Sequence, residues 1–157
     1  MRKKFVSKWA KVNTLELVAD RIKPVSKQGS WMLDRMLKAS AGLASLVHGD
    51  ANREHMNDIV ACHNMTWALQ RHRVGEDYNE MTDASEKAIR GITDRFKTLG
   101  RYVATGPEIK ALQDILELHQ AQLDICTVGQ VQEAYEYAKR THTTTSKLNT
   151  HFIGDLQ

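Results

Sequence analysis

Apolar residues recur at helical spacing from Ser30 onward. A first stretch runs from Trp31 to about Val47, after Ser30 as a potential N-cap and before Gly49 as a stop. Its apolar side comprises Met32, Leu33, Met36, Leu37, Leu43 and Ala44. The middle of this stretch, KASAGLAS, is rich in small residues. The pattern therefore predicts a helix that a neighbouring helix can approach closely.

A second periodic stretch begins at Asp50, a residue type that caps helices well, and runs to Val74, where Gly75 closes it. The residues predicted to face inward are Met56, Ile59, Val60, His63 and Trp67. This spacing predicts a long helix packed against the first one.

A third helix is predicted from about Asp77 to Leu99, with Gly100 ending it. Its apolar stripe carries Tyr78, Met81, Ala88, Ile92, Phe96 and Leu99. Oppositely charged residues four positions apart, Asp83 with Lys87 and Glu86 with Arg90, are expected on its solvent side.

Two capping-box patterns mark the last helices. Thr105 and Glu108 have the required spacing, and Pro107 is tolerated in a first turn, so a helix is expected from there to about Cys126. Thr127 and Gln130 repeat the pattern and begin a final helix. This final helix carries Val128, Val131, Tyr135 and Ala138 on its apolar side.

The ends of the chain carry weaker signals. Asn13 with Glu16 has capping-box spacing for a short helix that Pro24 would stop. After Arg140 the residues are polar and β-branched, which predicts a tail that frays or docks loosely through Phe152 and Ile153. No alternating strand pattern and no internal repeat is present. The sequence thus predicts an all-α, single-domain bundle of four to five helices (30–140), with an N-terminal arm (1–29) and a polar tail (141–157).

Composition agrees with one compact domain. The chain has 157 residues, 41% hydrophobic and 26% charged, which is enough to close a core without covalent cross-links. Two cysteines are too few for a disulfide framework, and no apolar run reaches the length of a bilayer span. The start of the chain lacks a continuous apolar region and a cleavage site. We therefore expect a cytoplasmic protein with no membrane association.

Positive charge is concentrated near the N-terminus. Residues 1–27 contain eight Lys or Arg against two acids, a charge of +6, whereas the other residues sum to −3. The basic arm residues alternate with the aromatic Phe5 and Trp9, so they can hold phosphates while a ring stacks on a base; they are Arg2, Lys3, Lys4, Lys8 and Lys11. Alternatively, Phe5, Trp9 and Val12 lie at helical spacing and would pack on the bundle, which is the interpretation that we favour.

His119 is the residue most out of character in the helix that begins near Thr105. It lies on a seam of apolar residues: Ile109, Leu112, Leu116, Leu123 and Cys126. We interpret it, like His63, as a core histidine with a nearby hydrogen-bond partner. The alternative is an acid–base pair with Asp114, Glu117 or Asp124, which helical spacing does not favour. No nucleophile or nucleotide-binding motif is present, so we expect no enzymatic activity.

Two His-x6-Cys pairs, His55 with Cys62 and His119 with Cys126, invite a zinc hypothesis. Seven residues rise about 10.5 Å along a helix, whereas two ligands of one zinc lie about 4 Å apart, so neither pair can chelate alone. Crosswise pairs between antiparallel helices, His55 with Cys126 and Cys62 with His119, would still need further ligands. We therefore expect no metal and no cofactor.

Two segments carry a resemblance: HGDANREHMNDIVACHNMTWALQRHRVGEDY and GPEIKALQDILELHQAQLDICTVGQVQEAYEYAKR. They resemble a group of small helical proteins of unknown function that phages, prophages and plasmids of proteobacteria encode. The resemblance covers roughly residues 46–140, and its most specific parts are LHQAQLD and TVGQ. It implies a mobile-element accessory protein in a bacterial host and carries over no catalytic residue.

Two functions therefore remain open. The first is a non-enzymatic module that binds a host or phage protein, as a regulator or an inhibitor of a host defence. The second is a nucleic-acid-binding protein that acts through the arm. We also expect a homodimer, because the helix after Thr105 is apolar on two sides and needs cover from several neighbours. One side carries Leu112 and Leu116, and the other Ala111, Ile115, Leu118 and Ile125.

Overall fold

The computed structural model describes residues 21–25, 30–75 and 78–144, with the backbone alone for 30–33 and 142–144. The predicted helix near Asn13, the six arm residues considered for nucleic-acid binding, and the expected tail contacts of Phe152 and Ile153 lie outside the described residues.

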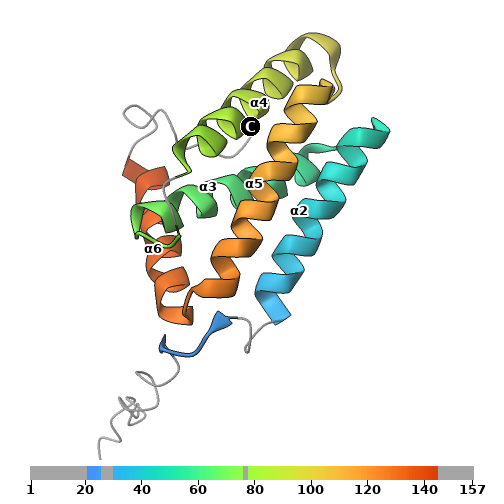
Figure 1. The fold of residues 1–157 in the computed structure, drawn as a ribbon. Coiled ribbons are helices and arrows are strands. Elements are labelled where there is room, and N and C mark those ends of the chain that lie inside the picture. Colours follow the sequence, from blue (N-terminus) through green and yellow to red (C-terminus); the bar gives the residue numbers. More distant parts are fainter. Residues whose placement is uncertain (1–20, 26–29, 76–77, 145–157) are drawn as a thin grey trace, which may run out of the picture.

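The described part of the chain is an all-α bundle, as the sequence predicted (Figure 1). Its helices are α2 (Ser30–His48), α3 (Arg53–Arg71), α4 (Asn79–Leu99), α5 (Gly106–Ile125) and α6 (Val128–Thr144). The described residues form no strand, and an isolated antiparallel bridge joins Pro24 to Thr127. The last helix continues to Thr144, beyond the start of the polar tail that the sequence suggested at residue 141.

Helix α3 is the centre of the bundle, because it packs against each of the other four helices. One core cluster joins α2, α3, α4 and α5 around Met56, Ile59, Ile92 and Leu112. A second cluster joins the end of α3 to the end of α5 and to α6, and includes Trp67. The inward residues predicted for α3, namely Met56, Ile59, Val60, His63 and Trp67, are all buried.

The close helix contact predicted from the small residues of α2 occurs at Gly42. A Cβ atom added at this position would lie 2.7 Å from the backbone oxygen of His55. The two backbones therefore meet where the α2 sequence has no side chain, and any larger residue would push α2 and α3 apart.

Several predicted caps are confirmed. Thr105 and Glu108 form a reciprocal capping box with Pro107 in the first turn, and Gly100 ends α4 in the left-handed conformation at φ 69°. The backbone N–H of Thr127 donates to Gln130 Oε1 at 2.9 Å, and the N–H of Gln130 donates back to Thr127 Oγ1 at 3.3 Å. These local signals placed the starts of α5 and α6 correctly.

The bounds predicted for α3 were wrong at both ends. Asn52, not Asp50, is the N-cap, because its Oδ1 accepts from the His55 N–H at 2.9 Å while its own N–H donates to the His55 ring. The helix ends at Arg71 rather than Val74, since Arg73 turns the chain with a φ of 56°. The turn directs Val74 into the second core cluster.

Some residues predicted on core faces are exposed. Leu37 is 61% exposed and Leu99 is 53% exposed; Ala44, Tyr135 and Ile125 also face outward. In α2 the buried face is set by Ala39, Leu43 and Leu46, which places Leu37 on the opposite side. Ile115 and Leu118 of α5 are buried within the single chain, so the reason given for a homodimer is wrong for these two residues.

The segment 21–25 lies against the start of α6. The Val128 N–H donates to the backbone oxygen of Lys23 at 3.0 Å, and the Val25 N–H donates to that of Cys126 at 3.2 Å. The Val25 side chain is buried in the second core cluster. The end of the sequence-defined arm is thus part of the packed body.

Candidate binding site

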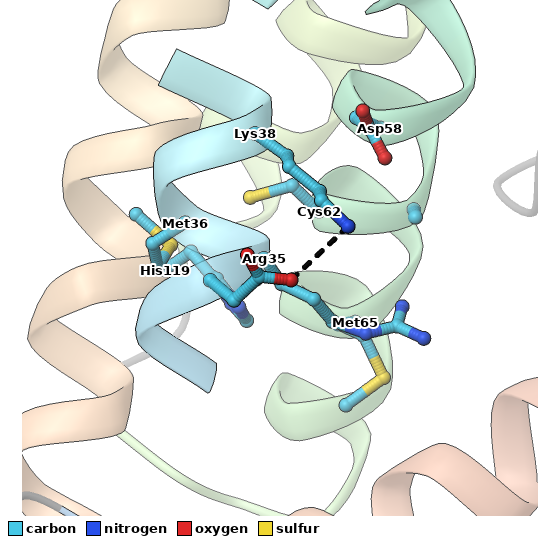
Figure 2. A pocket seen from close by; sticks show the side chains of 9 residues that line it. Arg35, Met36, Lys38, Asp58, Cys62, Met65 and His119 are labelled. Atoms are coloured by element: carbon cyan, nitrogen blue, oxygen red, sulfur yellow. Dashed lines mark ion pairs between the residues drawn. The ribbon is translucent and has the colours of Figure 1, made fainter. Parts of the chain in front are cut away.

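A pocket of about 380 Å³ opens between the first half of α2 and the middle of α3, and α5 contributes one wall residue (Figure 2). Its lining residues are Asp34, Arg35, Met36, Lys38, Asp58, Ala61, Cys62, Met65 and His119. The volume lies within the range of pockets that hold small molecules or a partner's anchoring side chain.

Helical spacing explains why these side chains meet. Asp58, Ala61, Cys62 and Met65 of α3 follow at intervals of three, one and three residues, which places them along one side of that helix. The close contact at Gly42 lies further along α2, toward the start of α3. The longer side chains of Met36 and Met65 line the pocket, and methionine can adapt its shape to a bound group.

The pocket carries charges of both signs at its exposed edge. Lys38 Nζ lies 3.1 Å from Asp34 Oδ2, on the next turn of the same helix. The hydrogen bond and the charge of Asp34 raise the pKa of Lys38, and the charges of Asp58 and Glu54 add to this. Arg35 supplies a second cation to the lining. A partner that presents both an acidic and a basic group would find complementary charges here.

The two ionisable groups in the interior of the pocket are both uncharged at neutral pH. Burial raises the pKa of the Cys62 thiol to about 12, although its interaction with Thr66 lowers it slightly. Burial lowers the pKa of His119 to about 4, against a smaller raising effect of Gln122. A thiol that stays protonated is a poor nucleophile, and an imidazole with this pKa carries no proton to donate as an acid near pH 7.

His119 also lacks the partner that an acid–base role requires. Its Nδ1 atom is buried and has no hydrogen-bond partner. Of the carboxylates considered from the sequence, Asp114 accepts from Lys110 and Asp124 accepts from Gln120 at 2.9 Å. The Gln122 amide donates instead to the backbone oxygens of Thr66 and Val74. This geometry favours a wall residue over a catalytic one.

His63 is a core histidine with a partner, as the sequence analysis expected. Its side chain is fully buried, and Nδ1 lies 2.6 Å from Ser85 Oγ on α4. The Ser85 hydroxyl lies in turn 3.0 Å from the backbone oxygen of Thr82. This short chain of polar groups links α3 to α4 within the core.

Of the two crosswise pairs considered for zinc, the structure brings one to the same place: Cys62 and His119 line the same pocket. His55 serves the N-cap of α3, and Cys126 is buried in the second cluster, where burial raises the pKa of its thiol to about 11. Within the described ranges, no three His, Cys, Asp or Glu side chains are grouped so that they could hold a metal ion.

Sequence reasoning identified His119 and Cys62 but missed the other pocket residues. The four-residue spacing of Asp34 and Lys38 is a visible signal for their ion pair. The pocket itself depends on how α2 and α3 are placed against each other, which no single stretch of sequence encodes.

Comparisons with protein-family models, curated proteins and solved structures find no match for this chain. Of the helices that the structure describes, none has both the length and the apolar character needed to cross a bilayer.

Proposed function

We propose that this chain is a non-enzymatic accessory protein of a phage or another mobile element, and that it binds a host or phage protein as a regulator or inhibitor. Inhibition of a host defence is one form of this role. The observation that carries the proposal is the pocket between α2 and α3, with its methionine walls and its edge of mixed charge. The resemblance of residues 46–140 to mobile-element proteins supports the cellular setting.

The pocket is suited to the anchoring side chain of a protein partner. Binding energy at protein interfaces is concentrated in a few large side chains that fill well-packed pockets, with polar groups around them. Met36, Ala61 and Met65 offer apolar contacts, and Arg35 and Asp58 can select the charges beside the anchor. The uncharged states of Cys62 and His119 support binding rather than catalysis.

Affinity capture from a host lysate, followed by mass spectrometry, tests the proposal when three forms of the full chain are compared. Ala61→Phe fills the pocket, whereas Ala84→Phe adds the same ring on an exposed position of α4. We expect a partner that is retained by the wild type and by Ala84→Phe and is lost with Ala61→Phe. Equal capture by all three forms would contradict a role for the pocket, provided that the variants melt as the wild type does.

Nucleic-acid binding through the arm is the second candidate function, favoured by the charge of +6 on residues 1–27. Its test is the ratio of absorbance at 260 and 280 nm for protein purified at low salt, before and after a high-salt wash. Bound nucleic acid that high salt removes would support this function, because phosphate contacts weaken steeply as salt rises.

A further inference from the structure

The outer side of α2 carries a row of exposed apolar residues that no described helix covers. Leu37 is 61% exposed and Val47 is 53% exposed, and the exposed Ala41 and Ala44 lie between them. The steps of four, three and three residues keep these side chains along one side of the helix. We call Leu37, Ala41, Ala44 and Val47 the outer row. In Figure 1, α2 stands at the edge of the bundle.

We infer that a second copy of this chain packs on the outer row, with the two α2 helices antiparallel. A twofold interface requires a surface that fits itself. The outer row has the order large, small, small, large, so in an antiparallel pair Leu37 of each copy meets Val47 of the other. The alanines in the middle allow the two backbones to approach closely.

Charges beside the outer row agree with this arrangement. Asp34 and His48 lie seven residues before and after Ala41, and both fall on the same flank of the row. The antiparallel pair that brings Leu37 opposite Val47 is centred at Gly42, one residue from the midpoint of Asp34 and His48, so it also places each Asp34 close to the His48 of the other copy. The Asp34 carboxylate, which already binds Lys38, can accept a further hydrogen bond from that imidazole. Parallel packing would instead bring like residues together.

One helix from each copy makes a small interface, below the area typical of a tight dimer. We expect a dissociation constant on the order of 10 to 100 µM. The inference does not rest on the proposed pocket function. Asp34 borders both surfaces, but none of the four residues of the outer row lines the pocket, so the two surfaces are changed by different substitutions.

Sedimentation equilibrium of the full chain tests this dimer. The wild type should approach twice the 17.8 kDa chain mass at several hundred micromolar and fall toward a monomer on dilution. Leu37→Glu or Val47→Glu should weaken association at least tenfold, because each places a charge against an apolar residue of the other copy. Leu99→Glu is the matched control, as Leu99 is also 53% exposed but lies at the end of α4, and it should associate as the wild type does.

A cysteine at the centre of the outer row provides a second readout. Ala41→Cys should form a disulfide-linked dimer under mild oxidation, because the two sulfurs meet near the twofold axis. Thr98→Cys, exposed on α4, should not, and the native Cys62 and Cys126 are buried. A wild type that stays monomeric throughout this concentration range, or glutamate variants that associate as strongly as the wild type, would overturn the inference.

Discussion

At the scale of single residues, His119 should make stability depend on pH. Its pKa is about 4 in the folded chain against 6.5 as a reference, so between these values the unfolded chain binds the proton more readily. Stability is therefore retained above about pH 6.5 and falls as the pH drops toward 4. From pH 7 to pH 5 the loss should be about 2 kcal/mol.

The variant His119→Gln removes this titration and should flatten the profile between pH 7 and pH 5, at a cost at neutral pH of no more than about 1 to 2 kcal/mol. Urea unfolding of both proteins at several pH values measures the effect. A wild-type slope that persists in His119→Gln would show that other groups cause it.

The two thiols should be unreactive in the folded protein. Burial holds the pKa of Cys62 at about 12 and that of Cys126 at about 11, and both side chains are buried. We expect a disulfide reagent such as dithiobis-nitrobenzoate to label neither cysteine in native buffer and both in denaturant. Rapid labelling of Cys62 alone in native buffer would instead mean that the pocket opens to its base.

At the scale of helices, the contact between α2 and α3 depends on Gly42. Alanine normally stabilises a helix relative to glycine, yet a Cβ at this position would lie 2.7 Å from the His55 backbone oxygen. We expect Gly42→Ala to destabilise the fold by about 1 to 3 kcal/mol. Thermal unfolding measures this, with Gly106→Ala as the control.

Gly106 opens α5, and an added Cβ there meets no atom within 4 Å. Gly106→Ala should therefore be neutral or raise the melting temperature slightly. If Gly42→Ala were equally harmless, the close approach of α2 and α3 would not contribute to stability.

Local signals made the helix starts predictable where side chains cap their own backbone. The box of Thr105 and Glu108 involves residues three apart, so the sequence displays it directly. The ion pair between Glu108 and Arg95 joins α5 to α4, and the sequence of neither helix predicts it. The cap at Asn52 escaped notice because its reciprocal partner is His55 rather than the usual Glu or Gln.

Faces of helices were harder to predict than their extents. The α2 pattern offered both Leu37 and Leu43 as inward residues, and the choice between them depends on where α3 and α5 lie. The same reason limits the site: His119 and Cys62 were singled out, but their meeting with Met36 and Asp58 is a consequence of packing between three helices. Sequence periodicity shows that a helix has an apolar side, but the packing of the helices against each other determines which apolar residues are buried.

At the scale of the whole molecule, the arm should contribute to stability. The structure shows residues 21–25 of the arm bound to the start of α6, and the sequence predicts that Phe5, Trp9 and Val12 also pack on the bundle. Deleting residues 1–11 changes the formal charge from +3 to −2. We expect the truncated protein to melt several degrees earlier, because each large buried side chain contributes about 1.5 to 3 kcal/mol.

Measuring the affinity of the protein for a DNA duplex at several salt concentrations distinguishes a phosphate-binding arm from a packed arm. If the arm is instead a phosphate-binding segment, the intact protein should lose affinity by roughly 0.7 to 0.9 log units per log unit of salt for each phosphate contacted. The truncated protein would then melt as before and lose this binding. That pair of results would favour the nucleic-acid function over the packed arm.

The most direct measurement of the central claim is the affinity of the captured partner for three forms of the full chain. Titration calorimetry should give the same dissociation constant for the wild type and Ala84→Phe. For Ala61→Phe, the ring occupies the space between α2 and α3, so the dissociation constant should rise at least about tenfold, equivalent to about 1.4 kcal/mol. Unchanged affinity in a folded Ala61→Phe would contradict the claim that this pocket is where the protein binds its partner.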